Sequence, residues 1–278
     1  MKIISLLLFI SIACAANAQY YYKDIVGTRE TAEMVRNYRT NKVSRVVLNS
    51  YDAENTRSDD FYVEQVFSPS SKRLVTTTRS GITAASVLTA FVDEKGNVFQ
   101  TIDSTEISKS TTTYQYNSDG LLLSVVSKSN DTANSGSGTE AHYWEYKEGR
   151  VARMLRVKDG KDTTYVNFKW DDRGNITEEQ GVRRGVALDP VYYYYDSNNR
   201  LTDIVRFHNK AKRLLPEYMF EYSPSNQVIQ KITVPSNSSE YLIWRYQYDN
   251  RGLKIREAVF DKHKQLTGKV EYQYQFGG

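Results

Sequence analysis

Aromatic residues recur in pairs along the chain, and one residue, usually polar, separates the two members of each pair. This alternation places both rings on one face of a β-strand and the intervening side chain on the other face. The second member of each pair, which we call the anchor, is Tyr116, Tyr146, Trp170, Tyr195, Tyr222, Tyr248 or Tyr274. Successive anchors are 30, 24, 25, 27, 26 and 26 residues apart. The pattern therefore predicts a structural repeat built from strands.

Turn-forming residues follow the anchors at fixed distances. In five copies an Asp, Asn or Ser comes directly after the anchor and a Gly or Asn comes four residues after it, which gives turns at 117–120, 171–174, 196–199, 223–226 and 249–252. Short polar side chains begin such turns, and Gly and Asn tolerate positive φ at their ends. Each repeat is therefore interpreted as a β-hairpin. We predict an all-β fold over residues 43–278, an antiparallel meander of repeated hairpins that coils into an open or closed barrel-like shell.

Two segments depart from the repeat. Residues 127–140 are rich in Ser, Asn and Gly and are expected to form its longest loop. Residues 19–42 precede the repeat domain, and the part from 27 to 42 carries one stripe of apolar residues. That stripe predicts a single short N-terminal helix of about ten residues, with Thr28 as its N-cap.

The first 18 residues have the form of a secretory signal peptide: Lys2, an apolar run to Ile12, and a small-x-small sequence before Gln19. Lipoprotein processing at Cys14 is the alternative. No later stretch approaches the roughly twenty apolar residues that a transmembrane helix needs. We expect an exported chain, located in the periplasm, at the cell surface or outside the cell. Cys14 is the only cysteine, so the mature chain is expected to hold no disulfide.

The stretches YYYDSNNRLTDI and YQYDNRGLKIREAVF resemble the YD repeats of the Rhs family, whose signature runs Tyr-x-Tyr-Asp-x-x-Gly-Arg-Leu. The resemblance covers residues 60–278 and is specific at the turns. It implies a strip of antiparallel sheet that spirals into a hollow shell, which in that family often surrounds a C-terminal toxin. The sequence stops within the last repeat, at YQYQFGG, so we expect no toxin domain here. The chain also resembles small exported proteins with such repeats from Bacteroidetes-type bacteria.

Charge does not point to a nucleic-acid partner. The chain has 37 Lys and Arg against 33 Asp and Glu, and loss of Lys2 with the signal leaves 36 against 33, a net charge of +3. Charges of the two signs are interspersed along the whole chain, without a block of five or six of one sign. We therefore expect no nucleic acid as partner; the sequence leaves the partner open, with a glycan or an envelope protein as the candidates.

Motifs for catalysis or metal binding do not emerge from the sequence. His142, His208 and His263 are too far apart for a local metal site, and they are interpreted as satisfied or surface residues. The acidic pair Glu178 and Glu179 is interpreted as structural, because neighbours in a strand point to opposite faces. We expect no catalytic residue, no metal and no cofactor, and hence a protein that is not an enzyme.

The aromatic face is the remaining candidate for ligand binding, because Tyr and Trp rings offer apolar area with a polar edge. Its speculative members are Trp144, Trp170, Tyr193 and Trp244. The expected function is a non-enzymatic binding or structural role at the cell envelope. An outer-membrane β-barrel is the alternative, and an enzyme that acts on extracellular glycan is a weaker one.

Overall fold

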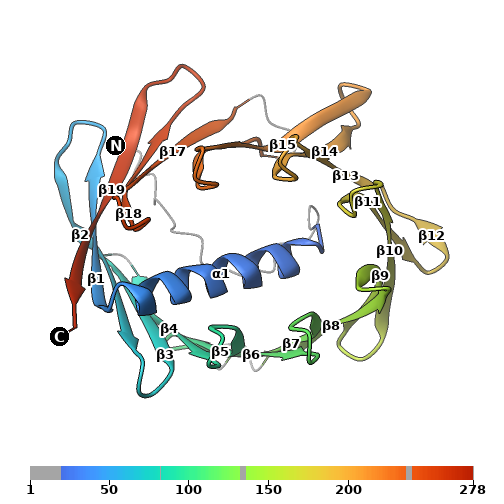
Figure 1. Cartoon of the computed structure of the whole chain (residues 1–278), viewed down its shortest axis with the longest axis horizontal. Helices are drawn as coiled ribbons and strands as arrows, with labels where there is room; N and C mark the ends of the chain where they lie inside the picture. Colours follow the sequence, from blue (N-terminus) through green and yellow to red (C-terminus); the bar gives the residue numbers. More distant parts are fainter. Residues whose placement is uncertain (1–19, 82, 132–135, 236–239, 278) are drawn as a thin grey trace.

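A ring of strands around a single helix forms the molecule (Figure 1). This computed structural model describes residues 20–81, 83–131, 136–235 and 240–277. The helix is α1 (Lys23–Thr40). The strands are β1 (Val43–Asp52), β2 (Arg57–Ser68), β3 (Arg73–Ser80), β4 (Thr83–Val92), β5 (Val98–Ser104), β6 (Ser108–Tyr116), β7 (Leu122–Asp131), β8 (Gly136–Lys147), β9 (Arg150–Lys158), β10 (Asp162–Trp170), β11 (Ile176–Arg183), β12 (Val186–Ala187), β13 (Val191–Tyr195), β14 (Leu201–His208), β15 (Arg213–Tyr222), β16 (Val228–Thr233), β17 (Leu242–Tyr248), β18 (Lys254–Phe260) and β19 (Leu266–Phe276).

The sheet closes on itself. Neighbouring strands pair antiparallel, and β1 pairs with both β2 and β19. The short β12 and the following β13 both pair with β11, so the 19 strands occupy 19 − 1 = 18 places around the barrel. Closure removes the two free edges that an open sheet would have. The prediction of an all-β hairpin meander that starts at Val43 is confirmed, in its closed form.

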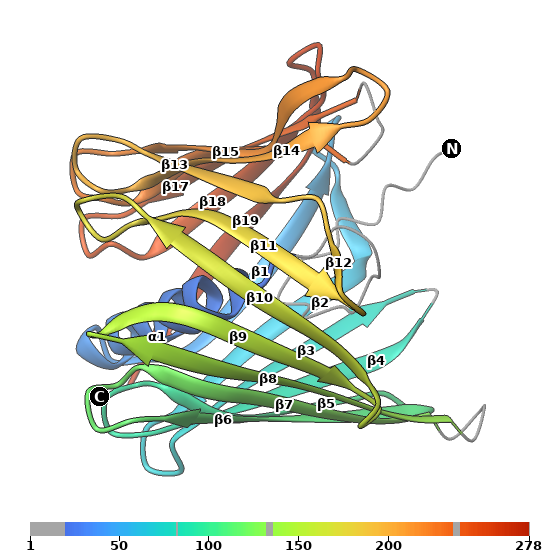
Figure 2. The ribbon, with the colours of Figure 1, turned by 90° about the vertical axis from the view of Figure 1, so that its right-hand side faces the viewer.

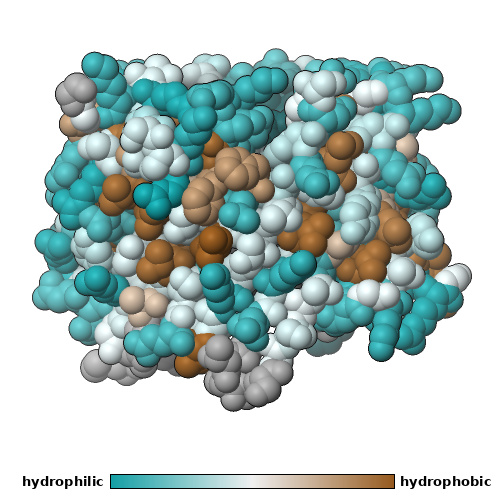
Figure 3. Space-filling view, turned by 90° about the horizontal axis from the view of Figure 1, so that it is seen from below, coloured by the Kyte–Doolittle hydropathy of each residue, from teal (hydrophilic) through white to brown (hydrophobic). Residues whose placement is uncertain are grey.

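Each strand presents one face to the lumen and one to the outside. In β10, Thr164, Val166 and Phe168 are buried, whereas Tyr165 and Asn167 between them are exposed. The outer surface mixes hydrophilic with hydrophobic side chains, as the view from below illustrates (Figure 3). The aromatic pairs therefore belong to the inward face, as the alternation predicts.

The predicted turns are confirmed. In the turn 249–252 the Asp249 carboxylate accepts the backbone N–H of Arg251 at 3.0 Å and of Leu253 at 2.9 Å. Gly252 closes that turn with φ +77°. Asn117, Asp171 and Asp196 make the equivalent pair of bonds in their turns. The turn chemistry read from the sequence is thus the chemistry that reverses the chain.

The anchor tyrosines connect one repeat to the previous one. Five of the six anchor tyrosines donate their hydroxyl to the backbone carbonyl of the residue that opens the preceding return strand. These bonds are Tyr116 to Val98 at 2.9 Å, Tyr146 to Leu122 at 2.9 Å, Tyr222 to Leu201 at 2.8 Å, Tyr248 to Val228 at 2.9 Å and Tyr274 to Lys254 at 2.7 Å. We call these bonds the tyrosine rungs. The hydroxyl of the sixth, Tyr195, is buried without a hydrogen-bond partner among the described residues. At the other five anchors the rungs favour Tyr, since Phe fills the same space but cannot donate.

Helix α1 crosses the lumen near one end of the barrel (Figure 2). It buries Ala32, Val35 and Tyr38. Near its C-terminus the Asn37 amide donates to the carbonyl of Gly252 at 2.9 Å, and the Arg39 guanidinium donates to the carbonyl of Glu94 at 2.5 Å. The helix thus packs against two turns of the barrel mouth, those between β17 and β18 and between β4 and β5.

Two details predicted for this helix are wrong. It has 18 residues rather than about ten, and its N-cap is Tyr22 rather than Thr28. Thr28 lies inside the helix, where its hydroxyl donates to the carbonyl of Asp24 at 2.8 Å. The helix begins earlier because a side chain from the barrel, Glu179, accepts the backbone N–H groups of Tyr21 and Tyr22 directly before it, and no local capping signal records such a partner.

The loop predicted over residues 127–140 is also wrong for the part that the structure describes. Strand β7 continues to Asp131 and β8 begins at Gly136. Small polar residues here do not mark a loop, because β7 and β8 pair through them, from Ser127 with Glu140 to Asp131 with Gly136.

The predicted signal peptide, with Cys14, lies outside the described residues. Among the residues that are described, no helix has both the length and the apolar composition needed to cross a membrane.

Replacing Gly252 with Val should destabilise the barrel by about 1 kcal/mol or more, because a β-branched residue is strained at positive φ. A Cβ there would also stand 3.3 Å from the Gln227 amide nitrogen. The measurement is the free energy of unfolding in urea. Gly136→Val is the matched control, since a Cβ at Gly136 meets nothing within 4 Å and its φ is not positive. An equal loss in the free energy of unfolding for Gly252→Val and Gly136→Val would contradict the turn assignment.

Candidate ligand pocket beside the central helix

A buried carboxylate holds the start of α1. Glu179 on β11 is 2% exposed. It accepts the backbone N–H of Tyr21 at 2.8 Å, the backbone N–H of Tyr22 at 2.9 Å and the hydroxyl of Tyr193 at 2.8 Å. Burial raises the pKa of Glu179, and the three donors oppose that rise. A negative charge at this place also suits the positive end of the helix dipole.

An ion network holds the first turn of α1. Asp24 accepts a hydrogen bond from Nδ1 of His142 at 2.5 Å, and Nε2 of His142 lies 3.0 Å from Glu140. Arg156 then pairs with Glu140 at 2.7 Å. Burial alone would lower the pKa of His142, but Asp24 and Glu140 outweigh burial and raise it to about 9. The imidazolium therefore links the helix to strand β8 at neutral pH.

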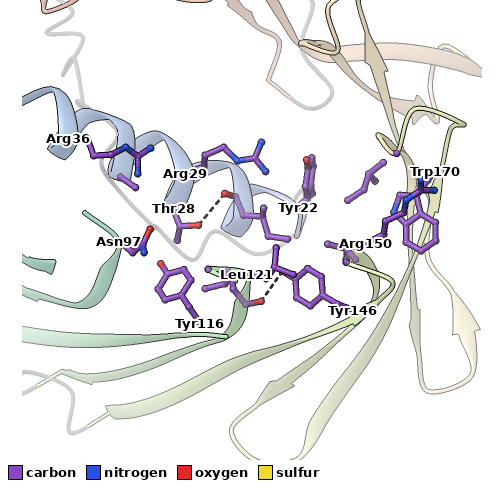
Figure 4. Close-up of a pocket in the computed structure, with 18 residues that line it drawn as sticks. Tyr22, Thr28, Arg29, Arg36, Asn97, Tyr116, Leu121, Tyr146, Arg150 and Trp170 are labelled. Carbon is purple, nitrogen blue, oxygen red and sulfur yellow. Dashed lines mark hydrogen bonds between the residues drawn. The ribbon is translucent and has the colours of Figure 1, made fainter. Parts of the chain in front are cut away.

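These contacts leave a cavity of about 270 Å³ between one side of α1 and the barrel wall (Figure 4). Tyr22, Thr28, Arg29 and Arg36 line it from the helix side. The facing wall comes from strand ends and turns of β5 to β11. Its larger side chains are Asn97, Tyr116, Leu121, Leu122, Tyr146, Arg150, Val151, Trp170 and Ile176.

The aromatic part of the wall is fixed in place. The hydroxyls of Tyr116 and Tyr146 are held in tyrosine rungs, so these rings are positioned by the sheet. Trp170 stands in the next anchor position, where it has no hydroxyl to make a rung, and it remains partly exposed. The ring of Tyr22 packs edge-on against Tyr193 at 5.4 Å. The cavity therefore has rigid aromatic walls.

The charged part of the lining is entirely positive. Arg29, Arg36 and Arg150 line the cavity, and its lining contains no Asp or Glu. Within the described part of the chain, no carboxylate lies within 4.0 Å of any of these three guanidinium groups. Arg36 makes one long bond, at 3.4 Å, to the carbonyl of Lys95. All three side chains are exposed to solvent.

The cavity coincides with an irregular place in the repeat. The turn between β8 and β9 has only two residues, Glu148 and Gly149, both at positive φ. The longer turn of the other copies is absent here, so Arg150 begins its strand directly at the rim. The Arg150 side chain lies against Gly174 of the next turn, where a Cβ would stand 3.6 Å from its Nε.

The four aromatic residues proposed from the sequence do not form one site. Trp144 is 4% exposed and stacks on Phe168 at 5.6 Å, and Tyr193 is 2% exposed and bonds Glu179. Trp244 lies on β17, where its indole N–H donates to Thr233 at 3.3 Å. Trp170 alone among the four lines the cavity.

Sequence reasoning missed the three arginines. Arg29 and Arg36 lie on α1 and Arg150 lies on β9, so only the closed fold brings them to one cavity. The shortened spacing after Tyr146 is the one sequence signal that marks this place. Among the described residues, no group of His, Cys, Asp and Glu is placed to hold a metal ion. The arrangement can attract an anion and contact an apolar ring; its lining holds no acid or imidazole for proton transfer.

Comparisons with known proteins give distant similarities. No protein-family model matches the chain, and no curated protein matches it. Among solved structures, it is similar to the Photorhabdus luminescens Tc holotoxin pore, with 11% identity over 82% of this chain and a TM-score of 0.31. It is also similar to the crystal structure of TcdB2-TccC3-Cdc42, with 10% identity over 81% and a TM-score of 0.25. The chain spans 15% and 16% of the lengths of those two chains.

A porin-like protein from Bacteroides vulgatus is the third similar structure, with 11% identity over 84% of this chain and 98% of that chain, and a TM-score of 0.28. TM-scores in this range assign neither a family nor an activity. The function is therefore argued from the residues of the chain itself.

Replacing Glu179 with Gln should lower the free energy of unfolding by about 2 kcal/mol, because the amide NH₂ would face donors that need an acceptor. Thermal and urea unfolding measure this loss. Glu178→Gln is the control, since Glu178 lies next to it on the outer face and pairs with Lys169 at the surface. Glu178→Gln should change the free energy of unfolding by no more than about 0.5 kcal/mol. Equal effects of both substitutions would show that Glu179 does not hold the helix.

The His142 network predicts a dependence of stability on pH. Its pKa is raised from 6.5 to about 9 on folding, so the folded state binds this proton more tightly. The stabilisation is complete below pH 6.5 and is lost as pH rises through about 9, by up to about 3 kcal/mol. Urea unfolding at pH 6.5, 8 and 9.5 tests it. His142→Gln should flatten this decline, and His263→Gln, in an exposed turn, should leave it unchanged. A decline of the same size in His142→Gln would refute the role of His142.

Proposed function

We propose that this chain is a small exported YD-repeat-like protein that binds a ligand without transforming it, and that it acts at the cell envelope, in the periplasm, at the cell surface or outside the cell. One observation carries the proposal: the cavity beside α1 combines fixed aromatic walls with three arginines that have no carboxylate partner. Export rests on residues 1–18, which have the composition of a signal peptide.

The architecture supports a binding role because it holds the cavity rigidly. The helix is tied at its start by Glu179 and His142 and at its end by the turns that contact Asn37 and Arg39. Sites that are formed before the ligand arrives lose little free energy to ordering on binding. A repeat array that only formed a wall would not require such a crossing helix.

The non-enzymatic part of the proposal is supported by the chemistry of the cavity. Hydrolysis of a glycan commonly uses two carboxylates that flank the scissile bond. The cavity lining contains none. Of the three candidate functions, a binding protein, an outer-membrane barrel and a glycan-active enzyme, the enzyme is therefore the weakest.

An outer-membrane barrel is the second candidate, and the closed antiparallel barrel with an even number of places favours it. Charged pairs on the outer face argue against it: Glu145 with Arg153 on β8 and β9, and Lys169 with Glu178 on β10 and β11. Charged side chains on a lipid-facing surface cost about 2–4 kcal/mol each near the bilayer midplane. We therefore favour a barrel surrounded by water.

Expression of the full chain with its own leader in a Gram-negative host tests the proposal. The protein is expected in the soluble fraction without detergent, and purified protein should show a tryptophan fluorescence change with a saccharide probe set that is lost in Trp170→Phe. Trp244→Phe is the matched control and should keep the response. Recovery only from outer membranes with detergent would favour the second candidate, and release of reducing sugar from any probe would overturn the non-enzymatic assignment.

A further inference from the structure

We infer that the cavity beside α1 takes an acidic saccharide, a sugar ring that carries a carboxylate or a sulfate group. The inference rests on the proposed binding function and names the ligand class of the same site.

Three arginines without a carboxylate partner gather at one cavity here. Two arginines of the barrel wall are paired instead: Arg156 pairs with Glu140 at 2.7 Å, and Arg206 pairs with Glu217 at 2.8 Å. At the turns, Arg200 pairs with Asp196 at 2.6 Å. Arg29, Arg36 and Arg150 have no such partner although they line one cavity. Their mutual repulsion is relieved when an anion enters, and a planar guanidinium matches a carboxylate or sulfate by paired hydrogen bonds.

Two acids in the turns around the cavity are already engaged. Asp171, in the turn beside Trp170, accepts the N–H groups of Arg173 and Asn175 and the Asn175 amide. Asp93, four residues before Asn97, accepts the N–H and the amide of Asn97 at 2.8 and 3.0 Å. Glu30 and Glu33 lie on α1 close to Arg29 and Arg36 in sequence, but neither of them lines the cavity.

The aromatic walls indicate a ring rather than a free anion. Trp170, Tyr116 and Tyr146 line the same cavity as the arginines. Aromatic faces contact the C–H face of a sugar, and they do so at little entropic cost when the rings are already fixed. An inorganic anion would bind the arginines but would make no contact with the aromatic walls.

The size of the cavity limits the enclosed part of the ligand. About 270 Å³ lies just below the range of about 300–1,000 Å³ typical of small-molecule sites. The cavity is also open to solvent at the barrel mouth, where all three arginines are exposed. One or two sugar rings therefore fit inside while the rest of a chain extends outward.

Titration calorimetry with the mature protein tests the inference with four probes. Digalacturonate supplies a carboxylate, N-acetylglucosamine 6-sulfate supplies a sulfate, the methyl ester of digalacturonate is the neutral counterpart, and inorganic sulfate is the anion alone. At least one acidic sugar should bind at least tenfold more tightly than the neutral ester and than inorganic sulfate, and its affinity should fall as salt rises. The two acidic probes distinguish carboxylate from sulfate recognition.

Substitutions locate the binding. Arg29→Met and Arg150→Met should each lower the affinity for the acidic sugar roughly tenfold while leaving the melting temperature of the protein unchanged. Arg153→Met is the matched control, because Arg153 lies three residues further along β9 and pairs with Glu145 on the outer face. The same weakening in Arg153→Met would show a nonspecific charge effect and overturn the inference.

The outcomes separate this inference from the proposed function. Equal binding of the ester and the acid, with loss in Trp170→Phe, would keep the binding function and overturn the acidic ligand. Binding of inorganic sulfate as tightly as either sugar would overturn the saccharide class. Absence of binding by all four probes at 10 mM would overturn the inference, while the wider saccharide set still decides the proposed function.

Discussion

The hydrogen bond from an anchor tyrosine to the backbone of the preceding repeat is the interaction on which the architecture depends. A hairpin alone is marginally stable, and antiparallel pairing by itself does not fix how each turn sits relative to the next. The rung adds a directional contact between neighbouring turns, such as Tyr248 to Val228 at 2.9 Å. Because the donor is buried at the end of a rigid ring, the turns are held in a row at one mouth of the barrel.

The helix depends in turn on that row of turns and on the polar lumen. Most barrel interiors of this strand number leave space that side chains of the wall cannot fill. Here α1 crosses the space, and buried charges rather than apolar contacts alone fix it, with Glu179 at its start and His142 beside Asp24. The cavity exists because the helix is narrower than the lumen and packs against only part of its wall.

The repeat and its turns could be predicted from the sequence because they arise from local chemistry. An Asp followed by Gly three residues later, as in Asp249 and Gly252, bends the chain wherever it occurs. The start of α1 could not be predicted, because the carboxylate that binds the backbone just before it, Glu179, lies more than 150 residues away. The arginines of the cavity could not be grouped for the same reason, since only the closed fold brings them together. The loop expected over 127–140 was wrong because polar composition was taken as a sign of a loop, whereas β7 and β8 pair through these residues.

The seam between β1 and β19 sets the order in which the molecule can assemble. Val46 of β1 pairs with Tyr274 of β19, so the first strand of the sheet cannot complete its pairing until the last strand is present. Contacts of such long sequence separation form slowly. The helix ends at Thr40 and β1 begins at Val43, so only two residues join the enclosed helix to the strand at the seam. The docking of the helix and the sealing of the barrel are therefore events at neighbouring places in the molecule.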